Sequence, residues 1–144
     1  MKSVLPNSIL FCILNAFIFI AIGCNPDEIA TKKAVADKKA VGRWHLTGIK
    51  SGWTGTISLP VQQVNLSIDQ QQQGIIYESG TAVIQFHYVL EDNTPGTLRY
   101  SINQQTGTST NFYPPSRGNF RVSSKQLIIG DTGVDGNDYI FEKI

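Results

Sequence analysis

The chain has 144 residues, a length that suits one domain. Its 12 lysines and arginines nearly balance its 11 aspartates and glutamates, so no overall charge directs it to nucleic acid or to acidic substrates. Charged residues make up only 16% of the chain and glycines number 13, which is typical of strands and turns rather than surface helices.

The first 23 residues have the pattern of an export signal. Lys2 gives a positive start, and in the apolar run 9–22 only Asn15 is clearly polar. A helix of this length would span roughly 21 Å, less than the ~30 Å hydrocarbon core of a bilayer. We therefore predict a signal peptide over residues 1–23 rather than a stable transmembrane span.

A cysteine, Cys24, follows this run directly. The stretch Ala21-Ile22-Gly23-Cys24 resembles the lipobox of bacterial lipoproteins, although Leu is commoner at the position of Ala21. The resemblance implies that the thiol of Cys24 receives diacylglycerol, that cleavage occurs before it, and that its amine gains an acyl chain such as palmitate. Two or three acyl chains on one residue are enough for lasting attachment to a membrane. We expect a chain anchored in the bacterial cell envelope, in the outer membrane.

An uncleaved anchor, or a plain signal peptide with a chance cysteine, is the alternative interpretation of this segment. The only other cysteine, Cys12, lies inside the signal and would leave with it. A disulfide in the mature chain is therefore not expected.

Residues 24–40 are predicted to form a lipidated tether with a short helix. Acidic residues come first and four lysines follow among alanines, an order that suits the helix macrodipole: Asp27, Glu28, Lys32, Lys33, Lys38 and Lys39. The lysines either form a solvated helix face, which we favour, or contact anionic headgroups beside the anchor.

From Val41 onward, apolar and polar residues alternate, as in half-buried antiparallel strands. The alternating segments are 43–46, 64–69, 82–90, 98–102, 120–122, 127–129 and 139–141. Residues typical of turns separate them at 69–74, 91–96, 103–107, 114–118 and 130–137. This spacing predicts a single all-β domain over residues 41–144, either a sandwich or a barrel, with eight or nine strands.

The start of this domain carries a second resemblance. Gly42-x-Trp44 resembles the G-x-W signature of lipocalins, and residues 41–144, which end with Tyr139-x-Phe141, look like the lipocalin-like domain of small bacterial lipoproteins. The resemblance implies an antiparallel up-and-down β-barrel of about eight strands, closed by its first and last strands. It also implies that a cation from the last strand covers the indole.

We predict that Lys143 supplies this cation, since it shares a face with Tyr139 and Phe141 and the last strand ends where the first begins. A cation–π contact with Trp44 is worth ~0.5–2 kcal/mol. Lipocalins usually have arginine at this position, and Arg121 is the reserve candidate.

Large aromatic residues on the presumed inward faces form the candidate ligand pocket: Phe86, Tyr88, Tyr100, Phe112, Phe120, Tyr139 and Phe141. They either line a site for a small apolar or amphipathic ligand, our leading prediction, or fill the barrel completely. In the second case the chain is a protein-interaction or inhibitor module acting through loop residues: Trp53, Tyr113, Pro114 and Pro115.

No catalytic residue, cofactor or metal site is predicted, and we expect no enzymatic activity. His45 and His87 have no cysteine or glutamate at metal-ligand spacing. Asp131 and Asp135 match part of a calcium-loop spacing, but Gly133 stands where another ligand is needed, so calcium binding stays open. Residues 41–144 carry seven basic and eight acidic residues, which excludes the basic groove of a nucleic-acid binder.

The first testable prediction concerns the anchor. Mass spectrometry of the membrane fraction is expected to find an acylated peptide that begins at Cys24, because lipidation precedes cleavage in the lipoprotein pathway that the lipobox implies. Recovery of a chain that still begins at Met1 would overturn this localisation.

Overall fold

The computed structural model describes residues 28–94, 96–109, 112–131 and 135–144. The signal peptide, the lipobox and Cys24 lie outside these residues. The described part comprises a helix followed by strands: α2 (Lys33–Ala40), β1 (Gly42–Ser51), β2 (Ile57–Ser58), β3 (Val64–Ile68), β4 (Gln73–Glu78), β5 (Thr81–Asp92), β6 (Leu98–Gly107), β7 (Arg117–Val122), β8 (Gln126–Gly130) and β9 (Asn137–Lys143).

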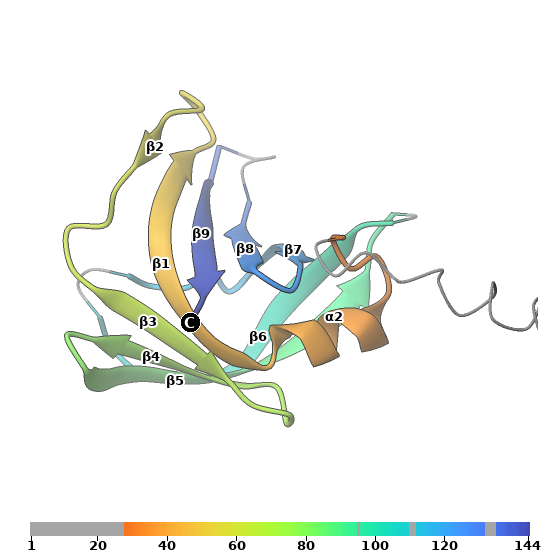
Figure 1. Cartoon of the computed structure of the whole chain (residues 1–144), viewed down its shortest axis with the longest axis horizontal. Helices are drawn as coiled ribbons and strands as arrows, with labels where there is room; N and C mark the ends of the chain where they lie inside the picture. Colours follow the sequence, from red (N-terminus) through yellow and green to blue (C-terminus); the bar gives the residue numbers. More distant parts are fainter. Residues whose placement is uncertain (1–27, 95, 110–111, 132–134) are drawn as a thin grey trace, which may run out of the picture.

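The strands form a closed antiparallel barrel (Figure 1). The order β1-β3-β4-β5-β6-β7-β8-β9 returns to β1, because β9 pairs with β1 along its length. Strand β2 lies outside this ring and pairs only with the end of β1. The predicted fold class, an all-β up-and-down barrel of eight strands preceded by a tether, is thereby confirmed.

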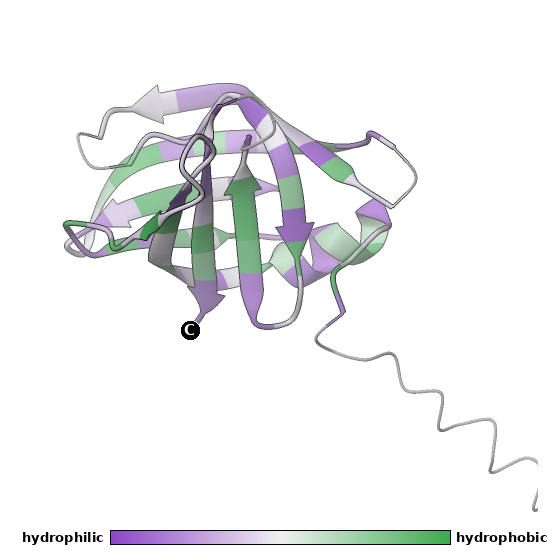
Figure 2. Cartoon of the chain, turned by 90° about the horizontal axis from the view of Figure 1, so that it is seen from above, coloured by the Kyte–Doolittle hydropathy of each residue, from purple (hydrophilic) through white to green (hydrophobic). Residues whose placement is uncertain are grey.

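Burial alternates with period two along the strands, and Figure 2 shows hydrophilic and hydrophobic residues alternating along several of them. In β3, Val64, Leu66 and Ile68 are buried while the residues between them are partly exposed. The same alternation runs through β5 and β7. Inward side chains of all the ring strands therefore meet in one continuous core.

One segment that was predicted as a turn belongs to a strand, and that prediction is wrong. Residues 103–107 continue β6 and pair with β5. Strand β7 pairs with β6 only at residues 98–101. The second half of β6 therefore pairs with β5 alone, and its polar side chains are largely exposed. The turn predicted at 69–74 does join β3 to β4, although β4 already begins at Gln73 within the predicted range. The carboxylate of Asp69 accepts the backbone N–H groups of Gln71 and Gln73 and tightens this bend.

The helix of the tether begins later than the acidic residues Asp27 and Glu28 led us to expect. It begins at Lys33, so its first turn carries no acidic residue, and Glu28 lies outside it. Ala36 and Ala40 are fully buried against the barrel, and the backbone N–H of Ala30 donates to the carbonyl of Val122 at 2.8 Å. The segment that precedes β1 thus packs on one end of the barrel. None of the described helices is long and apolar enough to cross a membrane.

The barrel therefore has two different ends (Figure 1). The tether end carries residues 28–41, helix α2 and the C-terminus of β9. The far end carries the β1–β3 connection, which we call the far-end segment (residues 51–63), and the described loop residues 108–109, 112–116, 131 and 135–136. Because β1 leads away from α2, these features lie at opposite ends of the same strands.

Candidate functional site

The tether end is closed by Trp44, which is fully buried. Its indole N–H donates to the carbonyl of Ala40 at 2.8 Å, and Lys143 Nζ lies 4.9 Å from the ring centroid. Trp44 and Lys143 are also register partners in the β1–β9 ladder. The predicted contact between them is confirmed.

Gly42 has two physical reasons to be glycine. Its φ of +141° is a backbone conformation that side chains disfavour, and a Cβ there would lie 2.8 Å from Lys143 Cε. The absent side chain therefore leaves room for the lysine stem to cross toward the indole.

Lys143 also binds the end of the helix. Its ammonium group donates to the carbonyls of Lys39, at 3.2 Å, and Val41, at 3.0 Å. Carbonyls at a helix C-terminus have no partner within the helix, so a cation there satisfies them and complements the helix dipole. The reserve candidate, Arg121, instead pairs with the buried carboxylate of Asp138.

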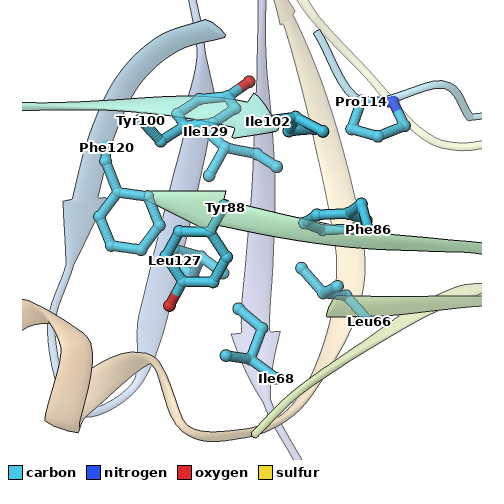
Figure 3. A pocket seen from close by; sticks show the side chains of 10 residues that line it. All are labelled: Leu66, Ile68, Phe86, Tyr88, Tyr100, Ile102, Pro114, Phe120, Leu127 and Ile129. Carbon is cyan, nitrogen blue, oxygen red and sulfur yellow. The ribbon is translucent and has the colours of Figure 1, made fainter. Parts of the chain in front are cut away.

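The candidate pocket residues do gather inside the barrel. All of them are buried except Tyr139, which is partly buried. In the middle of the interior, Phe120 stacks on Tyr88 at 5.8 Å and meets Tyr100 edge-on at 6.3 Å (Figure 3). A second group joins Phe112 to Tyr139 and Phe141, with ring centroids 4.7 and 5.7 Å apart.

These aromatic side chains fill the interior rather than line a pocket. The cavity among them measures about 10 Å³, close to the space of a single water, whereas small-molecule sites usually measure ~300–1,000 Å³. Within the described residues, Phe112 and Pro114 are buried although they belong to a loop. A Cβ on Gly74 would lie 2.3 Å from Phe86, so this ring already occupies the space that glycine leaves.

Two polar groups inside this core are unsatisfied. The hydroxyls of Tyr88 and Tyr100 have no hydrogen-bond partner within the described part of the chain, and Figure 3 shows them directed away from each other. Burial raises the pKa of both tyrosines well above its usual range; the carboxylate of Asp37 contributes further for Tyr88. Each neutral hydroxyl costs about 1–3 kcal/mol while it stays unpaired.

The far-end segment is apolar and exposed. Its large side chains are exposed to 62–96%: Trp53, Ile57, Leu59 and Val61. No charged residue occurs in positions 51–68. Of the predicted loop residues, Trp53 and Tyr113 are exposed, whereas Pro114 is buried and Pro115 is partly buried.

No cluster of metal-ligating side chains forms among the described residues. They contain no group of three or more His, Cys, Asp or Glu side chains that could hold a metal ion. His45 Nδ1 lies 2.9 Å from Asn65 Oδ1 across the β1–β3 pair, which gives it a structural partner. Asp131 and Asp135 flank residues outside the described ranges, so the structure does not test calcium binding by this loop, which was left open above.

Comparisons with known proteins give no assignment: no family model, no curated protein and no solved structure matches the chain.

Replacing Lys143 by methionine is expected to lower the free energy of unfolding by about 1–2 kcal/mol, because the cation over Trp44 and two bonds to helix carbonyls are lost. Chemical denaturation measures this change. Lys38→Met, which removes the same charge from an exposed position of α2, is the matched control with an expected change near zero. Lys143→Arg is expected to retain most of the stability. Equal effects of K143M and K38M would contradict the role of Lys143.

Removing either buried hydroxyl is expected to stabilise the barrel. Tyr88→Phe and Tyr100→Phe keep the ring contacts and eliminate an unsatisfied polar atom, so each is expected to raise the free energy of unfolding by about 1 kcal/mol. Tyr77→Phe, on the partly exposed side of β4, is the control with no expected gain. A loss of stability in Y88F or Y100F would instead show that a water or ligand pairs with that hydroxyl in solution.

Proposed function

We propose that this protein is an envelope lipoprotein, anchored through Cys24, whose filled barrel docks a protein partner at its far end. The observation that carries the proposal is the combination of an interior cavity of about 10 Å³ with an uncharged, exposed far-end segment. The barrel then acts as a scaffold, and binding occurs on its loops.

The position of the tether supports a protein that is anchored at one end of the barrel and binds its partner at the other. Cys24 precedes Glu28, the first described residue, by four positions, so an acyl anchor on it would lie within about 14 Å of the tether end. The far end would then be the part of the barrel most distant from the membrane. A docking surface there is accessible to partners that the membrane does not block.

The exposure of the far-end segment also supports docking. Leu59 and Val61 are 80% and 96% exposed, and Trp53, in the same segment, is 80% exposed. Several large apolar side chains exposed within one short, uncharged segment are more typical of an interaction site than a single exposed apolar residue, which is ordinary. Tryptophan is also enriched among the residues that dominate binding energy at protein interfaces.

A small apolar or amphipathic ligand inside the barrel is the second candidate, favoured by the unpaired hydroxyls of Tyr88 and Tyr100. Such a ligand would need Phe112 and Pro114 to leave the far end, because these residues close it now. Docking on the loops requires no rearrangement of the core and therefore ranks first.

Site-specific photo-crosslinking in cells tests the docking function. A photoreactive residue at Leu59 or Val61 is expected to give a discrete protein adduct, because these side chains are bare at the far end. The same residue at Asn103 or Gln126, which are exposed on the barrel wall, is the matched control and is expected to give none. Adducts of equal yield at all four positions, or at none, would contradict docking through the far-end segment.

A further inference from the structure

A groove lies beside the segment through which the chain enters the barrel. It measures about 470 Å³ and is lined by this segment, at residues 29–31, by residues 96–98 at the start of β6, and by the end of β7 at residues 119–121. Because residues 29–31 belong to the tether end, the groove lies there too (Figure 1). Its volume falls within the range of small-molecule sites, ~300–1,000 Å³, whereas the interior cavity of about 10 Å³ does not.

Much of the lining of the groove is apolar. Ala30, Leu98 and Phe120 are nearly fully buried and belong to the barrel core, so the groove reaches the margin of that core. Ile29 also lines the groove, and its side chain is 49% exposed. An apolar chain laid in the groove would therefore cover apolar surface that now meets water.

The polar part of the lining carries little free charge. Thr31 and Thr97 are exposed and Asn119 is partly exposed, so hydroxyl and amide groups lie toward the surface. Of the described lining residues, Arg121 alone is charged, and its guanidinium already pairs with the carboxylate of Asp138. The groove therefore suits an apolar chain with a neutral ester or amide linkage better than a free fatty acid, whose carboxylate would need a cation.

We propose that one acyl chain of Cys24 occupies this groove whenever the protein is outside a bilayer. The inference rests on the proposed anchor and gives its lipid a second location. Cys24 precedes Ile29 by five positions, so the two residues lie at most ~18 Å apart. A group attached by so short a linker has an effective concentration on the order of millimolar at the site. Free lipid in water would need a comparable concentration to displace it, which favours the attached chain as occupant.

The volume of the groove limits how much lipid it holds. A methylene group occupies about as much space as a water, roughly 30 Å³, so the groove accommodates about 15 such groups. This is one acyl chain, whereas the lipobox implies two or three on Cys24. A bilayer removes the same apolar surface from water as the groove does, so the groove has no advantage over an intact membrane. The acyl chain is therefore expected to leave the groove when the protein inserts.

Photo-crosslinking from the lipid tests this occupancy. Cells grown with a diazirine-bearing palmitate analogue supply the acylated chain, and a mixture of isotope-labelled and unlabelled chains separates adducts within one chain from adducts between chains. After dilution of the detergent, irradiation is expected to give adducts within one chain at residues 96–98 or 119–121. Addition of phosphatidylcholine vesicles is expected to lower their yield at least ~10-fold, because the lipid then enters the bilayer.

Two matched variants separate the groove from the rest of the tether. Ile29→Glu places a charge in the lining and is expected to lower the yield of groove adducts at least ~10-fold, because a carboxylate resists burial beside an acyl chain. Val35→Glu, on α2 and outside the groove, is the control with no expected change. The two replaced side chains are exposed to similar extents, 49% and 44%. Chemical denaturation is expected to show that both variants remain folded.

Three results would overturn the inference and leave the anchor standing: an acylated chain without groove adducts, adducts that persist with vesicles present, or equal yields in I29E and V35E. A photoreactive phosphatidylethanolamine added to the wild-type chain measures the competing occupant. If its adducts at the groove matched those of the attached lipid in yield, the groove would be assigned to free lipid instead. A Cys24 that carries no lipid would refute the anchor itself, and the inference with it.

Discussion

The pairing of β1 with β9 is the constraint on which the rest of this structure depends. The other ladders of the ring join strands that follow one another along the chain, with only β2 between β1 and β3, whereas this ladder joins the first and last strands and so closes the barrel. Its tether end gathers the buried indole of Trp44, the ammonium of Lys143 and the last carbonyls of α2. Closure of the barrel and attachment of the helix therefore use the same few side chains at this end of the ladder.

Much of the barrel is predictable from the sequence because alternation of burial is a local property. Tyr139, Phe141 and Lys143 alternate along the last strand and so share one face. This alternation was sufficient to predict the contact between Lys143 and Trp44. The strands that were missed are those without a clear alternation: β4 begins within polar glutamines, and the second half of β6 carries polar residues beside water. Strand β2 has only two residues and no periodic signal.

The candidate site was harder to predict than the fold because its properties depend on volume in three dimensions. The sequence identifies the inward aromatic residues, but whether they surround space or fill it depends on how Phe120, Tyr88 and Tyr100 stack and on the burial of Phe112 and Pro114 from a loop. Because the core is filled, the proposed binding role falls to the surface, where the far-end segment combines exposed apolar side chains with an absence of charge. The unpaired tyrosine hydroxyls are the one feature of the core that this division leaves unexplained.

The way the chain enters the barrel also determines how it responds to tension. Before α2, the hydrogen bond from Ala30 to Val122 holds the entering backbone, and α2 itself is a short helix seated mainly through Ala36 and Ala40. Force applied to the N-terminal end would detach this segment from the barrel first, while the hydrogen bonds between β1 and β9 remain intact. Residues 28–40 span roughly 40 Å when fully extended. The segment would therefore extend under force before the barrel itself is loaded.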